Sequence, residues 1–183
     1  MLNTELIYNK ANDIVTQCGT RDVDAIAHEL GLTVLERDDF KRLLGMYTYQ
    51  LRHRLVFLSS QLDEPLHRIV LAHEIGHDTL HRPLASSGRC LQEFTLFDIR
   101  SITEYEANAL AAHLLIDNDE VYALAKQGYD IMQISQMLGV HANLMLIKMQ
   151  EMNRMGYGFK MPCTPHGDYL KKVNAQEDRY VQY

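Results

Sequence analysis

The chain has 183 residues, of which 46% are hydrophobic and 23% charged, a composition typical of globular proteins and unlike disordered or collagen-like ones. A chain of this length can bury a sizeable core by itself, so a metal in it would serve chemistry rather than folding. The net charge of −6 gives no global electrostatic case for a nucleic-acid binder. The three cysteines are never spaced as C-x-x-C, which argues against a disulfide framework or a cysteine zinc site.

The beginning of the chain is polar and mixed in charge, without the basic and apolar regions of a secretion signal. No apolar run approaches the ~18 residues that are needed to span a bilayer. We therefore expect a soluble, cytoplasmic protein with no membrane partner.

The first third of the chain is predicted to form two helices, a strand and a hairpin. Apolar residues at helical spacing predict a helix over residues 4–17, and Asp22 is a suitable N-cap for a short second helix. Residues 32–36 alternate enough to form a strand. Segments 46–49 and 55–58 have β propensity, so the polar LRHR between them predicts a hairpin connection, which lacks the usual Asn-Gly or Asp-Gly turn.

The middle of the chain predicts three helices. The first should begin at Asp63 and end by Pro83, because the residue before a proline resists the α conformation. Residues 84–101 have little periodicity and are interpreted as a loop over or beside a site. A second strong helix is predicted over residues 102–116, and a third from 117 to about 125.

The last part of the chain differs in character. The pattern of residues 129–157 is typical of a helix-turn-helix. Residues 158–183 are predicted to form an extension that contributes little to the hydrophobic core. The order of a helix, a small hairpin and further helices predicts an α+β fold that is mostly helical, with a small antiparallel β-hairpin or sheet.

A motif with metal-site spacing lies inside the helix that begins at Asp63. It reads His73-Glu74-Ile75-Gly76-His77, and positions i and i+4 lie on one face of a helix, so both imidazoles can point at one ion. Glu74 is rotated by about 100°, so it cannot readily be a ligand but can reach a metal-bound water and take its proton. A shuffled chain of this composition would contain the motif about 0.03 times, which favours a catalytic site over two incidental histidines.

A catalytic zinc site needs a third protein ligand. The metzincin pattern is excluded, because Leu80 and Pro83 stand where it requires a glycine and a histidine. His81 lies about 12 Å along the helix axis from His73, too far to share an ion with it. We expect His81 to support a ligand or to lie at the surface.

The remaining candidates for the third ligand are Glu104, Glu106, His113 and Asp98. Glu104 shares its helix face with alanines that would let another helix approach, and a carboxylate buried there needs a partner such as a metal. The face of Glu106 is more polar. This comparison favours Glu104 and leaves the others open, and Asn108 could hold a histidine or the carboxylate in place.

HEIGH, followed by Glu104-x-x-Ala107-Asn108 and by HLLI at 113–116, resembles the ImmA/IrrE family of metallo-endopeptidases. The resemblance covers about residues 5–156 and includes the helix-turn-helix-like segment. It implies that His73, His77 and Glu104 bind the metal and that Glu74 is the base. Departures from the family's common residues occur at Leu110, His113 and Ile116-Asp117.

The resemblance also implies a biological role. Such proteins are typically encoded by bacteria, phages and mobile elements, and they cleave a partner helix-turn-helix repressor of the Xre type. It therefore implies an intracellular Zn²⁺-dependent endopeptidase that relieves transcriptional repression, with Mn²⁺ possible because one ligand is a carboxylate. The implied organisation is a zincin-like metallopeptidase domain (1–126), a helix-turn-helix-like segment packed on it (127–157) and a C-terminal extension (158–183).

The sequence does not decide two features of the proposed chemistry. The residue that assists the metal in stabilising the transition state is not identified, and Tyr105, His81 and His113 are candidates. An extended substrate could pair with an exposed edge of the hairpin at residues 46–58.

The alternative function is a non-enzymatic metal-binding regulator, or a DNA- or protein-binding module that uses residues 129–156. The second helix of this segment has only Lys148 and Arg154 as fixed cations, and Glu151 opposes them, so direct nucleic-acid binding is not expected. A general peptidase with broad substrates is a third, less favoured hypothesis.

Overall fold

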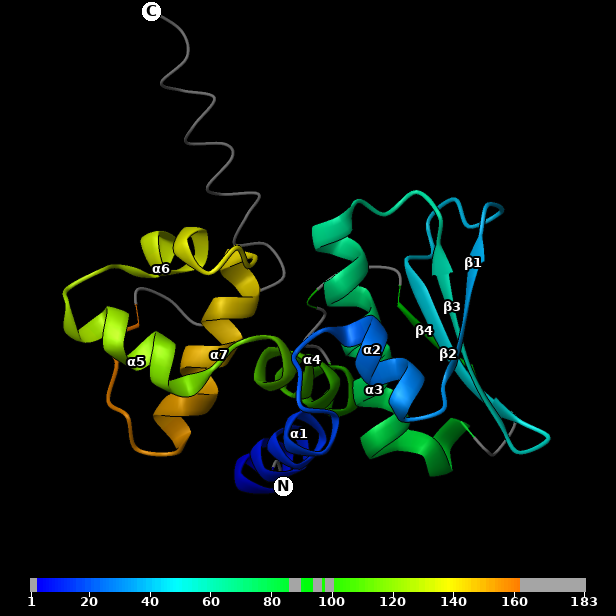
Figure 1. Ribbon diagram of the computed structural model, residues 1–183, viewed down its shortest axis with the longest axis horizontal. Helices are drawn as coiled ribbons and strands as arrows, with labels where there is room; N and C mark the ends of the chain where they lie inside the picture. Colours follow the sequence, from blue (N-terminus) through cyan, green and yellow to red (C-terminus); the bar gives the residue numbers. More distant parts are fainter. Residues whose placement is uncertain (1–2, 86–89, 94–96, 98–100, 162–183) are drawn as a thin grey trace, which may run out of the picture.

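A computed structural model describes residues 3–85, 90–93, 97 and 101–161 of the chain (Figure 1). Within these residues, seven helices and one four-stranded sheet form a mixed α+β fold, as the sequence predicts. The helices are α1 (Thr4–Cys18), α2 (Val23–Glu29), α3 (Glu64–Ala85), α4 (Ile102–Leu115), α5 (Asn118–Lys126), α6 (Ile131–Met137) and α7 (Ala142–Arg154), and the strands are β1 (Thr33–Arg37), β2 (Gly45–Gln50), β3 (His53–Ser59) and β4 (Leu91–Glu93). Most of the predicted extension, residues 162–183, lies outside the described residues.

The sheet has the strand order β1-β3-β2-β4. Strands β2 and β3 form the predicted antiparallel hairpin, with a two-residue turn in which Leu51 and Arg52 adopt φ of 49° and 67°. Strand β1 pairs with β3 in parallel, and β4 pairs with β2 antiparallel inside the segment that was expected to be a loop. The expected exposed edge of the hairpin is partly covered, because β1 pairs along β3 and β4 pairs with Gly45, Met46 and Tyr47 of β2.

Helix α3 lies between the sheet and α4, and it contacts both (Figure 1). The prediction that it ends by Pro83 is wrong, because the helix continues to Ala85. Proline has no N–H to donate to the carbonyl oxygen of Thr79, four residues earlier. Lys10 Nζ of α1 donates to that oxygen at 3.5 Å, so the acceptor left by the proline has a partner.

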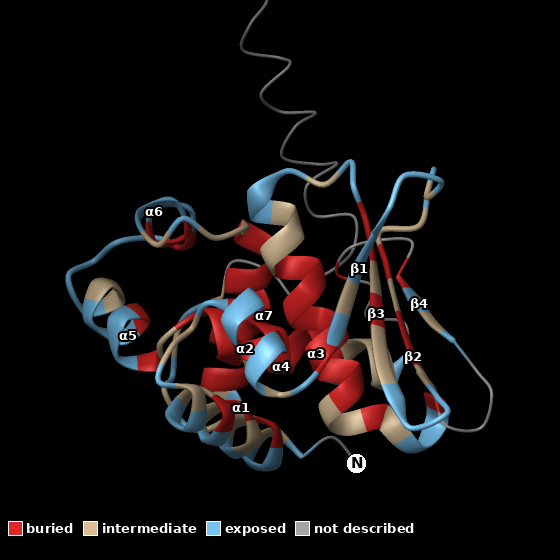
Figure 2. Ribbon diagram, turned by 45° about the vertical axis from the view of Figure 1, so that its right-hand side comes forward, coloured by how far each residue is buried: buried red, intermediate tan, exposed pale blue. Residues whose placement is uncertain are grey.

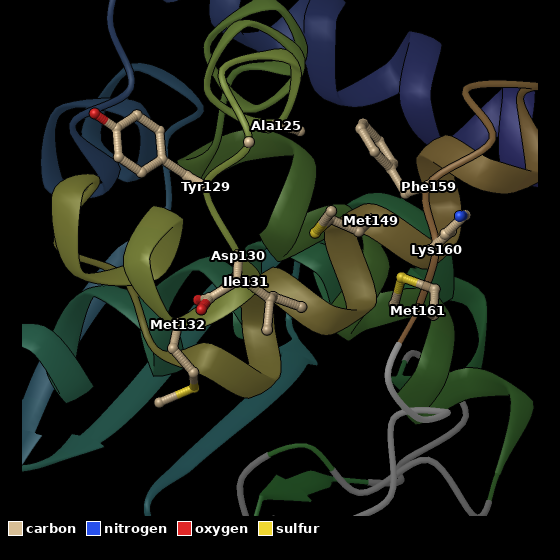
Figure 3. A pocket seen from close by; sticks show the side chains of 10 residues that line it. Ala125, Tyr129, Asp130, Ile131, Met132, Met149, Phe159, Lys160 and Met161 are labelled. Carbon is tan, nitrogen blue, oxygen red and sulfur yellow. The ribbon is translucent and has the colours of Figure 1, made fainter.

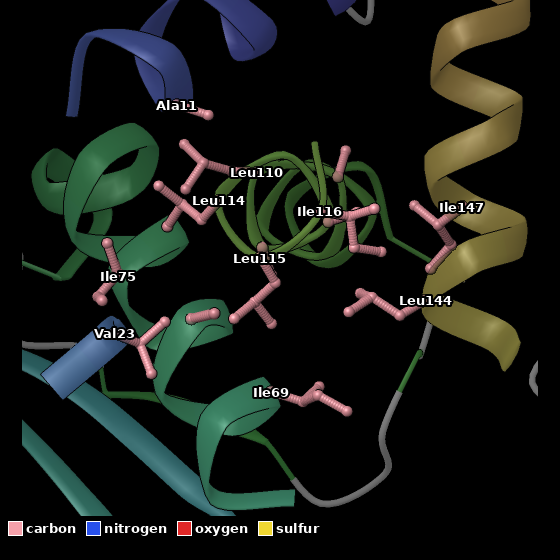
Figure 4. Close-up of a cluster of buried hydrophobic side chains, with 14 of the residues drawn as sticks. Ala11, Val23, Ile69, Ile75, Leu110, Leu114, Leu115, Ile116, Leu144 and Ile147 are labelled. Atoms are coloured by element: carbon pink, nitrogen blue, oxygen red, sulfur yellow. The ribbon is translucent and has the colours of Figure 1, made fainter. Parts of the chain in front are cut away.

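Helix α4 is the centre of the helical layer, and Figure 2 shows buried residues concentrated on α3 and α4. Every residue from Ala107 to Leu115 is buried, which is typical of a helix that is covered on all sides. Leu110 and Leu114 lie toward Ala11 of α1, and Ile116 lies toward α7 (Figure 4). Burial on this scale fixes the orientation of α4, and with it the direction of its polar side chains.

The C-terminal part of the described chain forms α5, α6 and α7, on the side of α4 away from the sheet (Figure 1). Helix α6 begins with a capping box, in which Asp130 accepts from the backbone of Gln133 while the Gln133 side chain accepts from the backbone of Asp130. Helix α7 packs against both α4 and α6. Among the described residues, no helix combines the length and apolar character that crossing a membrane requires.

Candidate metal centre

The two histidines of the motif lie in the buried middle of α3. The helix begins where Asp63 accepts a hydrogen bond from the backbone N–H of Leu66 at 3.0 Å. Its apolar residues pack into the core, and His73 and His77 are each only 1% exposed. Because the two residues are four positions apart on one helix, their rings meet with Nε2 atoms 3.0 Å apart.

Helix α4 brings a carboxylate to these histidines. It begins at Ser101, whose hydroxyl accepts a hydrogen bond from the backbone N–H of Glu104 at 3.1 Å. Glu104 Oε2 lies 3.2 Å from His73 Nε2 and 3.5 Å from His77 Nε2. The three side chains form the one group with metal-ligand chemistry found in the described part of the chain.

A glycine determines how closely the two helices approach. A Cβ atom on Gly76 would lie 2.8 Å from the carbonyl oxygen of Ala107 and 2.9 Å from its Cα. Gly76 therefore lets α3 and α4 touch backbone to backbone, next to His77 and about one turn from His73 and Glu104. The small residues that the sequence shows on both helices are what bring Glu104 within reach of the two imidazoles.

The geometry of this cluster fits a metal ion. Ligands about 2.1 Å from a tetrahedral zinc ion are separated from one another by about 3.4 Å. The three measured separations, between 3.0 and 3.5 Å, fall around that value. Both carboxylate oxygens of Glu74 are buried and accept no hydrogen bond, so the site holds acceptors that a cation and its water would satisfy.

Neighbouring side chains orient both imidazoles. His73 Nδ1 lies 3.0 Å from Oδ1 of Asn108, an oxygen that can only accept, so Nδ1 carries a proton and Nε2 faces the carboxylates of the cluster. His77 Nδ1 lies 3.1 Å from Nδ1 of His81, whose Nε2 lies 3.0 Å from Glu106. Asn108 and His81 thus contact the two motif imidazoles at Nδ1, the ring nitrogen that does not face Glu104.

The carboxylates of the cluster attract positive charge. Burial alone would lower the pKa of His73, but hydrogen bonds to Glu104 and Glu93 raise it well above its ordinary value. Burial likewise opposes the ionisation of Glu104, yet hydrogen bonds from His73 and His77 lower its pKa. Burial lowers the pKa of His77 to about 4, so this imidazole is neutral at pH 7, which is the form that binds metals.

Glu74 lies beside the cluster and is fully buried. Burial raises its pKa to about 8, and the negative charges of Glu93 and Glu104 add to this effect. A divalent cation held nearby would favour its ionised form. A Cβ on Gly45 at the start of β2 would lie 2.5 Å from Glu74 Oε1, so this glycine makes room for the carboxylate.

The structure does not bring two of the sequence-predicted supporting residues to the cluster. His113 faces α1 and α7, where its Nδ1 lies 2.9 Å from Lys148 Nζ and its ring packs on Tyr8. The hydroxyl of Tyr105 donates to Glu151 of α7 at 2.6 Å. The expectation that either residue supports the site is wrong, because the packing of α4 against other helices turns them away from α3.

One cluster residue has no signal in the sequence. Glu93 is 3% exposed, and its Oε2 lies 3.1 Å from His73 Nε2. It belongs to β4, which has three residues and is too short to show a strand period. Asp98, the other candidate from this segment, lies outside the described residues.

A separate pocket of about 710 Å³ lies between α5, α6 and residues 159–161 (Figure 3). Its lining is largely apolar and includes Ile131, Met132 and Met149, together with the charged residues Asp130 and Lys160. None of the cluster residues contributes to it. Since the histidines and buried carboxylates lie elsewhere, the pocket is not the place where metal chemistry is expected.

Comparison with known proteins gives three relationships. The model of the IrrE N-terminal-like domain, peptidase family M78, matches residues 27–150. The uncharacterized immunity region protein 2 of Bacillus phage phi105 is 27% identical over 143 residues, which are 78% of this chain and 89% of the phage protein. A solved structure of a Mycobacterium tuberculosis transcriptional regulator has a TM-score of 0.55 and 17% identity, over 88% of this chain.

The regulator is informative about the fold alone, and this chain spans about half of its length, 49%. The family model covers the motif helix, the sheet from β1 to β4, and α4. The resemblance drawn from HEIGH and Glu104-x-x-Ala107 is confirmed by this match. The chain belongs to the IrrE N-terminal-like family of metallopeptidases, the ImmA/IrrE family.

Proposed function

We propose that the chain is a zinc-dependent endopeptidase in which His73, His77 and Glu104 hold the metal and Glu74 is the general base. The observation that carries the proposal is the buried donor triangle with edges of 3.0, 3.2 and 3.5 Å, next to an unpaired carboxylate. When bound, the metal lowers the pKa of a water and polarises the scissile carbonyl.

The chain's own groups supply the proton chemistry. Glu74, whose oxygens have no other partner, accepts the proton of the attacking water and returns it to the leaving amine. Asn108 and His81 hold the imidazoles with Nε2 toward the metal. Burial excludes bulk water, which strengthens the electrostatic interactions of these groups. Two imidazoles favour Zn²⁺, and the carboxylate also makes Mn²⁺ a suitable ion.

We propose a helix-turn-helix repressor in the cytoplasm as the protein substrate, whose cleavage relieves transcriptional repression. Two findings support this choice: membership of the ImmA/IrrE family, and the similarity to a phage protein named for an immunity region. Residues 127–157 then form a segment packed on a peptidase domain of residues 1–126. Contacts between α4 and α7, such as Tyr105 with Glu151, support the packing of this segment on the domain.

Direct DNA binding by the helix-turn-helix-like segment has little support. Lys148, the first of its two fixed cations, is 1% exposed and contacts His113. Arg154, the second, is paired with Glu151 and Tyr105. Most of α7 is buried against the rest of the chain, so it does not present a free face to a DNA groove.

The test uses purified Glu74→Gln protein with helix-turn-helix repressors from the same genome as substrates. We expect the variant to bind Zn²⁺ with wild-type affinity in a chelator competition but to lose cleavage of the repressor, because the amide cannot accept the proton. Glu64→Gln, an exposed change on the same helix, should cleave like the wild type. Undiminished cleavage by Glu74→Gln, or cleavage by wild type in excess chelator, would contradict the proposal.

A further inference from the structure

The metal cluster contains one carboxylate more than the proposed function uses. Glu93 Oε2 lies 3.1 Å from His73 Nε2. Measured from the same nitrogen, His77 Nε2 and Glu104 Oε2 lie at 3.0 and 3.2 Å. Glu93 Oε2 is therefore as close to His73 Nε2 as the two other proposed ligand atoms are.

The position of Glu93 is set by the backbone of β4. Glu93 is paired with Gly45 in the antiparallel register, and its carbonyl oxygen accepts from the N–H of Leu44 at 2.8 Å. Gly45 is the residue that also makes room for Glu74. Two strands and α3 thus converge on the cluster, and the Glu93 side chain points into it with 3% exposure.

The buried carboxyl group of Glu93 also needs a partner. Its Oε1 is buried and accepts no hydrogen bond, so it is an acceptor that a cation would satisfy. Ionised carboxyl groups that lie this close together repel one another unless a cation lies among them. A divalent ion at the cluster would offset this repulsion, and Glu93 is placed to contact it.

We propose that Glu93 is a fourth protein ligand, which closes the metal site in the resting protein. This inference rests on the proposed ligands His73, His77 and Glu104. Structural zinc sites have four protein ligands, whereas catalytic sites leave one position for water. As a fourth ligand, Glu93 would hold the position that a water needs, so hydrolysis would require the carboxylate to leave and a water to enter.

The strand that carries Glu93 is suited to such an exchange. It has three residues and lies at the edge of the sheet, with β2 as its neighbour on one side. Release of so short a strand breaks few backbone hydrogen bonds. An extended polypeptide that takes the place of β4 beside β2 would both remove Glu93 and present its own backbone to the metal.

The test measures metal binding and needs no substrate. Zn²⁺ affinity is determined by chelator competition for wild type, Glu93→Gln and Gln92→Ala, an exposed neighbour on the same strand. We expect Glu93→Gln to bind at least tenfold more weakly and Gln92→Ala to match the wild type. Urea unfolding of the chelator-treated proteins shows whether the variant keeps its fold.

A second measurement uses the wild type alone, so it does not depend on a variant that folds. The visible spectrum of the Co²⁺-loaded protein is recorded with increasing azide, which binds where a ligand position is open. We expect no response in the wild type and a clear response in Glu93→Gln. A wild-type spectrum that responds to azide would overturn the fourth ligand.

The outcomes separate this inference from the proposed function. Equal Zn²⁺ affinities of wild type and Glu93→Gln would overturn the role of Glu93 and leave the other three ligands in place. Failure of the wild type to bind Zn²⁺, Mn²⁺ or Co²⁺ would overturn the proposed function itself.

Discussion

The contact between α3 and α4 at Gly76 leads to the most direct prediction. In Gly76→Ala the new Cβ would lie 2.8 Å from the carbonyl oxygen of Ala107, where an ordinary contact begins at 3.4 Å. The helices must therefore separate by about 0.6 Å. Overpacking of this kind costs about 1–3 kcal/mol, and the better helix propensity of alanine offsets about 1 kcal/mol of it.

The effect on metal binding should exceed the effect on stability. Metal–ligand distances tolerate changes of about 0.2 Å, and Glu104 is held on the helix that moves. We expect Gly76→Ala to lose about 1 kcal/mol in urea unfolding and to bind Zn²⁺ ten- to hundredfold more weakly, the range found when the supports of a metal ligand are changed.

A control locates the clash. The atoms that the new Cβ meets belong to the backbone of Ala107, so the double variant Gly76→Ala, Ala107→Gly should not recover affinity. Recovery would show that the side chain of Ala107 causes the clash. A Gly76→Ala variant as stable as the wild type, with unchanged affinity, would refute the close contact of α3 and α4.

Three further predictions concern other parts of the molecule. Asn108→Ala removes the acceptor that contacts His73 Nδ1 and should weaken Zn²⁺ binding ten- to hundredfold in chelator competition. Asn108→Asp keeps an acceptor there and should lose less Zn²⁺ affinity. Burial lowers the pKa of Lys148 to about 7, so between pH 7 and about 10 the unfolded chain binds more protons than the folded one, and stability rises with pH. Lys148→Met should reduce the increase of the urea midpoint with pH. An unchanged dependence of the midpoint on pH would contradict the burial of this charge. Replacing Leu51 and Arg52, which adopt positive φ in the hairpin turn, by Asn-Gly should add about 1 kcal/mol of stability, and a lower urea midpoint would argue against strain in the turn.

The features that the sequence determined by itself are local ones. The spacing of His73, Glu74 and His77 places two imidazoles on one helix face because the helical period is a property of the backbone. Helix beginnings at Asp22 and Ser101 follow from side chains that accept hydrogen bonds from the next turn. The family resemblance rests on the same short motifs, together with Glu104.

The tertiary structure decided which side chains meet. Glu104 and Glu106 are two positions apart on α4, yet the first lies against His73 and the second against His81, because Gly76 sets how α3 and α4 pack together. The position of Glu93 depends on the pairing of β4 with β2, which three residues cannot signal in a linear pattern. Contacts between distant segments arise from packing, and no local periodicity records them.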